Sequence, residues 1–199
     1  MKTVAFRPGT WPVRLLCVSD THVPTRARRL PDALLTEASR ADLVVHAGDL
    51  VSREVLIVLG ARAPVVAVAG NMDTAETEQE LGRAAVVEVG PWRIGLVHGD
   101  EGGERDTPSR ALATFLGAGL GCRPAGAGAE RAVDVVVFGH SHQPLVDTRC
   151  GVLLVNPGSA TDCRFAPWPS CATLTLEGPE RNTPPRAEIR RLPRPGQGR

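Results

Sequence analysis

Residues 13–22 of the chain read VRLLCVSDTH, an apolar run that ends in a polar tetrapeptide. The run from Val13 to Val18 is too short for a stable helix, and its polar flank predicts a buried strand. Asp20 and His22 then lie on the loop at the carboxyl end of this strand. Because residues two apart in an extended segment share one face, both side chains can reach a single metal ion.

The same arrangement of strand and polar loop follows twice more along the chain. The expected elements are a helix over residues 31–40, a strand over 43–46 before Gly48-Asp49, a helix containing 55–59 with Ser52 as its cap and Gly60 as its left-handed end, and a strand over 65–69 before Gly70-Asn71. Strands joined by helices pair in parallel through right-handed crossovers, so the three polar loops should emerge at one sheet edge. Open α/β sheets bind their ligands at that edge.

A second set of β runs ends in further histidines. A hairpin at Gly90-Pro91 leads into His98-Gly99, and an apolar run leads into the segment 139–142, which reads GHSH. The expected elements are strands over residues 84–89, 92–97, 133–138, 145–148, 152–155 and 172–176, and a helix over 109–116 with Thr107 as its N-cap. We expect a flexible loop at 117–130, a single domain over residues 1–192 and a disordered tail at 193–199.

Composition excludes several classes of function. The chain has 199 residues, a formal net charge of +1 and 42% hydrophobic residues, so it offers no general attraction to nucleic acid or to an anionic membrane. Its five cysteines are odd in number and form no C-x-x-C pair, which predicts reduced thiols and a cytoplasmic location. Residues 1–11 lack the apolar core of a signal peptide, and no apolar run approaches the roughly 18 residues of a membrane helix.

Metal-ligand side chains stand at the ends of these apolar runs. They are Asp20, His22, Asp49, Asn71, His98, His140 and His142. A mixed oxygen and nitrogen set without thiolate suits Mn, Fe, Ni or Zn, and seven donors fit two ions if one carboxylate bridges, for which we choose Asp49. Two divalent ions and two aspartates leave a surplus of about two positive charges, which would attract a phosphate ester and acidify a bridging water for in-line attack on phosphorus.

With these motifs the chain resembles the calcineurin-like metallophosphoesterases, in particular the small single-domain phosphodiesterases of bacteria and archaea. The turn Asn156-Pro157-Gly158-Ser159 also resembles a signature of that branch. The resemblance covers roughly residues 13–177 and implies an α/β (α+β) fold, a four-layer αββα sandwich of two mixed β-sheets with flanking helices. It further implies a binuclear centre with two divalent ions, above all Mn2+, with Ni2+, Fe2+ or Zn2+ as alternatives.

The resemblance also implies roles for the individual residues. The first ion would be bound by Asp20, His22, Asp49 and His142, and the second by Asp49, Asn71, His98 and His140. Asp49, Asn71 and His98 would take part directly in hydrolysis of a small phosphoester, a phosphodiester in preference to a monoester. The alternative is a protein-interaction scaffold on the same fold, similar to the small retromer subunit.

Two positions depart from the pattern of many relatives. Met72 stands where they carry a histidine that assists the leaving group, and a thioether has no proton to donate. Asp100 stands where they frequently carry a second histidine, so its role is open. His46 is expected to pack or to hydrogen-bond behind the ligands, and Asp73 to form a turn, with a contact behind the ligands as the alternative.

Two further segments allow two interpretations each. The arginines at positions 26, 28 and 29 could clamp a phosphate, but a solvated loop is favoured. The segment 164–169, which reads RFAPWP, could line a substrate cleft with aromatic surface, but a loop that covers a sheet edge is favoured.

Overall fold

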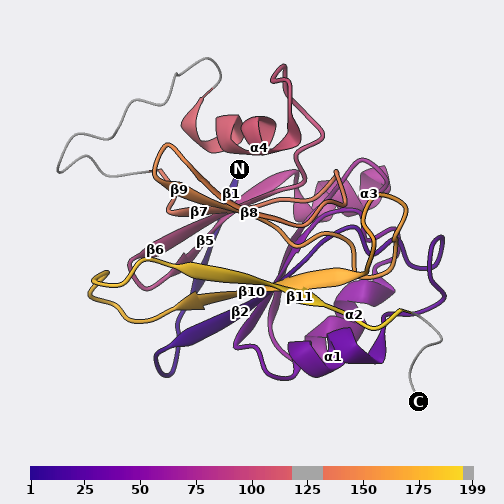
Figure 1. Ribbon diagram of the computed structural model, residues 1–199, viewed down its shortest axis with the longest axis horizontal. Coiled ribbons are helices and arrows are strands. Elements are labelled where there is room, and N and C mark those ends of the chain that lie inside the picture. Colours follow the sequence, from indigo (N-terminus) through magenta and orange to yellow (C-terminus); the bar gives the residue numbers. More distant parts are fainter. Residues whose placement is uncertain (118–131, 195–199) are drawn as a thin grey trace.

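The computed structural model describes residues 1–117 and 132–194 (Figure 1). The strands are β1 (Lys2–Phe6), β2 (Val13–Val18), β3 (Leu43–Ala47), β4 (Val65–Val68), β5 (Ala84–Val89), β6 (Trp92–Val97), β7 (Val135–Val137), β8 (Leu145–Arg149), β9 (Val152–Asn156), β10 (Ser170–Leu176) and β11 (Arg186–Arg191). The helices are α1 (Asp32–Ala38), α2 (Glu54–Gly60), α3 (Ala75–Leu81) and α4 (Thr107–Leu116). Residues 118–130 of the expected flexible loop and residues 195–199 of the expected tail lie outside the described residues.

The strands form two mixed sheets. The five-stranded sheet has the order β11-β10-β2-β3-β4, in which β2, β3 and β4 are parallel as the sequence predicts. The six-stranded sheet has the order β1-β5-β6-β7-β9-β8, with β6, β7 and β9 parallel to one another. The carboxyl ends of β2, β3 and β4 therefore share one edge of the first sheet, and those of β6, β7 and β9 share one edge of the second.

The alternation of side chains along β2 shows how the two sheets are layered. Leu15 and Cys17 belong to the apolar core that also contains Ile94 of β6, whereas Leu16 and Val18 belong to the core that contains Leu34 of α1. Because successive side chains of a strand point to opposite faces, β2 is buried on both sides. The first core thus lies between the sheets and the second between the five-stranded sheet and its helices.

A third core covers the outer face of the six-stranded sheet. Here Ala111 and Phe115 of α4 pack with Val136 of β7 and Phe138. Figure 1 shows α4 on one side of the paired sheets, and α1 and α2 on the opposite side. The expected four-layer αββα sandwich is confirmed.

Several element boundaries differ from those expected. The structure adds β1, α3 and β11, which sequence patterns did not predict, since β1 and β11 are mostly exposed or half-buried. At the start of helix α2 the Ser52 hydroxyl accepts the backbone N–H of Glu54 at 3.2 Å, although Arg53 directly precedes the helix. Gly60 is the last helical residue and not a left-handed end. Asp106 caps α4 in place of Thr107, and its carboxylate accepts the backbone N–H of Ser109 at 2.7 Å.

The expectation for the cysteines is partly wrong. Cys17, Cys163 and Cys171 are free, but Cys150 is disulfide-bonded. Pairing depends on how close two Cα atoms come in the fold, which spacing along the chain does not reveal. No helix within the described ranges has the length and apolar character needed to cross a bilayer. The cytoplasmic location stays a prediction.

Candidate metal centre

The backbone at the predicted ligands is unusual. Eight non-glycine residues in the described part of the chain have positive φ, and five of them are predicted ligands. These five are Asp20, His22, Asp49, His140 and His142, with φ between 43° and 65°. A left-handed conformation costs a non-glycine residue on the order of 1–3 kcal/mol and is commonest at functional sites, so the loops are held in this shape by their surroundings.

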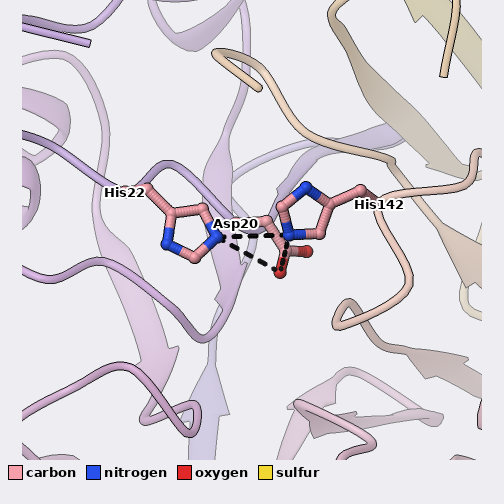
Figure 2. Close-up of side chains that lie close together, drawn as sticks. All are labelled: Asp20, His22 and His142. Carbon is pink, nitrogen blue, oxygen red and sulfur yellow. Dashed lines mark hydrogen bonds and ion pairs between the residues drawn. The ribbon is translucent and has the colours of Figure 1, made fainter. Parts of the chain in front are cut away.

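The first group of side chains converges at the end of β2 (Figure 2). His142 Nε2 lies 3.2 Å from Asp20 Oδ1 and 3.2 Å from His22 Nε2, and His22 Nε2 lies 3.9 Å from Asp20 Oδ1. All three residues are buried. Two imidazole nitrogens and one carboxylate oxygen that face each other at these distances form a geometry suited to a metal ion.

The second group gathers around Asn71, beyond the end of β4. Asn71 Oδ1 lies 3.1 Å from His98 Nε2 and 3.2 Å from His140 Nδ1. Asn71 is exposed, His140 is partly exposed and His98 is buried. These three donors come from β4, β6 and β7, so both sheets contribute to this group.

Asp49 lies between the two groups. Its Oδ2 is 3.6 Å from His22 Nε2, and its Oδ1 is 3.4 Å from His98 Nε2. One carboxylate therefore turns an oxygen toward each group. The structure brings all seven predicted ligand residues to one place at the carboxyl ends of the strands.

The charges at the centre favour a cation. Burial by itself lowers the pKa of His98, but the hydrogen bond that the ring donates to Asp49 and the charges of Asp20 and Asp49 outweigh it and raise the pKa to about 9. Burial raises the pKa of Asp49, but the hydrogen bond and charge of His98 bring it below its ordinary value. A divalent ion supplies the positive charge that these buried carboxylates lack and would displace the proton from His98.

Asp20 provides a direct test of whether a metal fits. Its Oδ1 is buried and makes no hydrogen bond within the described residues, although it faces His142 and His22. A buried carboxylate oxygen without a partner costs free energy unless something binds it. A metal ion with oxygen and nitrogen ligands fits this position.

Backbone contacts hold the ligand loops together. The N–H of Asp20 donates to the carbonyl of Gly48 at 3.0 Å, and Gly139 N–H donates to the carbonyl of His98 at 3.0 Å. A Cβ added at Gly70 would collide with the carboxylate and backbone of Asp49. Only glycine therefore allows the third loop to approach Asp49 so closely.

Asp73 organises the second and third loops. Its carboxylate accepts the backbone N–H groups of Asp49 at 2.9 Å, Val51 at 2.7 Å and Gly70 at 2.8 Å. The residue forms a turn, as the sequence predicts, and it also holds the backbone of a predicted ligand.

The turn after β9 supports the centre from the other side. Asn156 Nδ2 donates to the carbonyl of Gly139 at 2.9 Å, and Ser159 Oγ donates to the carbonyl of Asp20 at 2.7 Å. The Asn-Pro-Gly-Ser turn thus contacts the loops that carry Asp20 and His140, which gives it a structural role.

The positions left open by the sequence have definite surroundings. His46 is fully buried, its Nε2 lies 3.1 Å from the Thr21 hydroxyl, and burial lowers its pKa to about 3. Asp100 forms a short ion pair with Arg83. Met72 is exposed, and its backbone N–H donates to Asp49 Oδ1 at 2.8 Å.

The arginine cluster lies in a separate pocket. Arg26, Arg28 and Arg29 line a cavity of about 400 Å³ together with Arg194, and no predicted ligand lines it. Arg26 Nε approaches Asp162 Oδ2 at 3.8 Å, whereas Arg29 pairs with Asp32 on α1.

The segment 164–169 contacts both a candidate ligand and the edge of a sheet. The ring of Phe165 meets that of His142 edge to face, with centroids 5.4 Å apart and an interplanar angle of 83°. Trp168 instead stacks under the guanidinium of Arg191 in the edge strand β11, 3.7 Å from the ring centroid. The first part of the segment borders the metal centre, and the second part covers a sheet edge.

Sequence reasoning missed one residue beside the centre. Asp162 is buried, and its Oδ2 lies 3.6 Å from His142 Nδ1. The local sequence Asp-Cys-Arg matches no ligand motif. Only the position three residues after the Asn-Pro-Gly-Ser turn could have drawn attention to it.

Comparison with known proteins identifies a family. A sequence model of the calcineurin-like phosphoesterase superfamily domain matches residues 13–178. A probable metallophosphoesterase of Methanothermobacter thermautotrophicus is 36% identical over 161 residues, covering 81% of this chain and 84% of the relative. A probable metallophosphoesterase of Methanocaldococcus jannaschii is 38% identical over 160 residues, covering 80% of this chain and 74% of the relative.

Solved structures share the fold. Vps29 of Entamoeba histolytica, complexed with Zn2+, superposes with a TM-score of 0.62 at 24% identity, covering 90% of this chain and 99% of its own. An archaeal phosphodiesterase superposes with a TM-score of 0.55 at 19% identity, covering 89% of this chain and 99% of its own. At these identities the likeness shows the fold alone.

Proposed function

Because the chain belongs to the calcineurin-like phosphoesterase superfamily, we propose that it is a metal-dependent phosphodiesterase with a binuclear centre. The observation that carries this proposal is the position of Asp49, whose two carboxylate oxygens face the two groups of ligands at 3.6 and 3.4 Å. A bridging carboxylate is what a two-ion centre requires.

The distances support the division of ligands that the sequence suggests. In this proposal the first ion is held by Asp20, His22, Asp49 and His142. The second ion is held by Asp49, Asn71, His98 and His140. The donor set contains no thiolate, which favours Mn2+ and allows Ni2+, Fe2+ or Zn2+. The Zn2+ complex of the Vps29 structure shows that this fold can hold a metal in another protein.

The charge balance explains why a phosphate ester would bind. Two divalent ions against Asp20 and Asp49 leave a surplus of about two positive charges. Two such ions supply Lewis acidity and lower the pKa of bound water. The protein's part is to fix the ligands, and the strained loops and the close contact between Gly70 and Asp49 do this.

Met72 bears on the type of ester. Its exposed thioether stands beside Asn71, where a histidine would hold a proton for the leaving group. Without that proton, esters whose leaving group needs no protonation should react fastest. Preference for a diester over a monoester is the finer part of the proposal, and the archaeal phosphodiesterase of the same fold shows only that another protein combines this fold with that activity.

Hydrolysis of bis-p-nitrophenyl phosphate tests the function. We expect turnover with Mn2+ after removal of metals with a chelator, and slower turnover of p-nitrophenyl phosphate. Asp49→Asn should lower kcat/KM at least about 1000-fold, because loss of a single group that stabilises the transition state already costs about 100- to 1000-fold.

A matched variant controls for nonspecific effects. Asp147→Asn removes a carboxylate from the edge strand β8, where it pairs with Arg149 at 3.0 Å, and should retain activity. Full activity in Asp49→Asn would overturn the mechanism. Faster turnover of the monoester would overturn the diester preference and leave the phosphoesterase in place.

The interaction scaffold is the second candidate, and the Vps29 likeness supports its fold alone. A scaffold predicts a stable complex and no turnover across esters and metals, whereas the enzyme predicts about two ions per chain together with turnover. Measurement of metal content on the active preparation separates the two candidates.

A further inference from the structure

Asp162 lies behind one of the predicted ligands. It is 5% exposed, and its Oδ2 is 3.6 Å from His142 Nδ1, on the side of the ring opposite Nε2. Nδ1 of His142 is itself buried and makes no hydrogen bond within the part of the chain that the structure describes. A buried ring nitrogen and a buried carboxylate therefore face each other, and the nitrogen has no other partner among the described residues.

The carboxylate of Asp162 is held in place from the outside. Arg164 Nε donates to Oδ1 at 3.0 Å and to Oδ2 at 2.8 Å, and its Nη2 lies 2.6 Å from Oδ2. The residue is thus a hydrogen-bond acceptor of fixed orientation.

A single hydroxyl connects Asp162 to the first ligand group. Ser159 Oγ accepts the backbone N–H of Asp162 at 2.8 Å and donates to the carbonyl of Asp20 at 2.7 Å. The turn after β9 therefore positions Asp162 and Asp20 relative to each other. His142 is placed between the two carboxylates, with Nε2 toward Asp20 and Nδ1 toward Asp162.

His98 of the second group has a different partner. Its Nδ1 lies 2.8 Å from the carbonyl of Ala47, a neutral acceptor. A histidine ligand that donates to a carboxylate is a stronger base toward its metal than one that donates to a carbonyl, and its ring orientation is fixed as well. The two metal positions therefore differ in how their histidines are supported.

We propose that Asp162 is a positioning residue that accepts the Nδ1–H of His142, holds Nε2 free to bind the first metal ion and raises the affinity of that position. This inference rests on the proposed metal-dependent function. Asp162 contacts neither substrate nor metal in this scheme, and it acts through His142 alone. A purely structural role for Asp162, in ion pairs with Arg164 and Arg26, is the competing explanation.

Metal binding to the full chain, freed of metal with a chelator, tests the proposal. We expect Asp162→Ala to weaken the tighter Mn2+ site about 10- to 100-fold in calorimetric titration, the range found for partners of ligating histidines. Asp162→Asn keeps an acceptor oxygen without the charge and should fall between the wild type and Asp162→Ala.

Asp134→Asn is the matched control. Asp134 is also buried, pairs with Arg181 and accepts the backbone N–H of Arg93 at 2.9 Å, but it precedes β7 at the end away from the metal centre. It should lose thermal stability on a scale similar to the Asp162 variants and keep the wild-type Mn2+ affinity.

A second readout needs no metal. The ¹⁵N shifts of the His142 ring in the metal-free protein should report a proton on Nδ1 in the wild type and a mixture of tautomers in Asp162→Ala. Wild-type Mn2+ affinity in Asp162→Ala, or an unchanged tautomer, would overturn the positioning role and leave the phosphoesterase intact. A wild-type protein that binds no Mn2+ would overturn the proposed function and this inference with it.

Discussion

The two halves of the metal centre are built differently. The first half consists of three buried residues. Asp20 and His22 follow the inner strand β2, and His142 lies in the loop after β7. In the second half His98 is buried after the inner strand β6, but Asn71 is exposed and follows β4, the edge strand of the sheet that contains β2. His140 is partly exposed. Ligands on inner strands are held by packing on both sides, whereas those beyond an edge strand depend on loop contacts. The first position should therefore bind its ion tightly, and the second should exchange its ion more readily.

The largest effect in this comparison is expected when one ligand is removed from each position and the metal content is measured. Asn71→Ala removes an amide oxygen from the second group and should lower kcat/KM at least about 100-fold, because even indirect partners of metal ligands contribute about 10- to 100-fold. The protein should still retain one Mn2+ per chain when metal content is measured after gel filtration. His22→Ala, in contrast, should lose the tighter ion.

The control for this pair is Asn182→Ala, which changes an exposed asparagine in the segment before β11. It should keep both ions and full activity. If Asn71→Ala retained two ions of wild-type affinity, the second position would not depend on its exposed ligand, and the difference between the halves would be wrong.

The next effect concerns the loops of the second half. Asp73→Ala leaves three backbone N–H groups without their acceptor, those of Asp49, Val51 and Gly70. We expect the free energy of unfolding to fall by about 3 kcal/mol, because an unsatisfied buried donor costs about 1–3 kcal/mol and water can reach part of this half-buried site. Urea unfolding measures the loss, and hydrogen exchange of the Val51 and Gly70 amides should accelerate more than that of β2. Uniform acceleration in both places would show that Asp73 stabilises the whole fold and not the second half.

The convergence of the seven candidate ligands could be predicted from the sequence because strand ends have a fixed geometry. The run before Asp20 is apolar and short, and the parallel order of β2, β3 and β4 follows from the helices between them. The period of two along β2 then decides which of the two cores each side chain enters. These are local signals or general rules of connection, and they require no knowledge of which loops touch.

The partners behind the ligands could not be predicted in the same way. Asp162 contacts His142 only because the turn after β9 folds back over the end of β2, and its own sequence resembles any exposed loop. Strand β11 reads RAEIRR, so its charged residues hide the apolar alternation that would mark a strand. The sequence similarly shows neither the three N–H groups that Asp73 binds nor the disulfide at Cys150.

The pH dependence of folding stability should show whether water reaches the buried half of the centre. His46 lies beneath it, fully buried, with a pKa lowered by burial to about 3, against 6.5 for an ordinary histidine. Above pH 6.5 both folded and unfolded states are neutral here. As the pH falls below 6.5, the unfolded state takes up a proton that the folded state refuses, so stability is lost progressively down to about pH 3.

The size of this loss can be isolated with one variant. Each pH unit costs about 1.4 kcal/mol between pH 6 and 4, and His46→Gln should remove that part of the dependence. Urea unfolding of chelator-treated wild type and variant at several pH values gives the difference, free of any contribution from metal release. Parallel stability curves would mean that His46 is protonated in the folded state and that water reaches the buried half.

The smallest expected effect lies on the surface around the centre, where one exposed apolar residue borders each half. Phe165 is 56% exposed and contacts His142 of the first half, whereas Met72 is 54% exposed and follows Asn71 of the second. An aromatic contact contributes about 0.5–1.5 kcal/mol, so Phe165→Ala should raise KM for bis-p-nitrophenyl phosphate by about 2- to 10-fold and leave kcat nearly unchanged.

Methyl p-nitrophenyl phosphate, which has only the aryl group that is released, shows which half of the centre binds the leaving group and which half binds the second aryl group. If the aryl group that is not released lies over the first half, Phe165→Ala should affect only the diaryl ester, and Met72→Ala should affect both. Ile57→Ala, at a 72% exposed position on α2, should change neither. Equal effects of Phe165→Ala on both esters would place the leaving group over the first half. The substrate would then lie in the orientation opposite to the one expected from Met72.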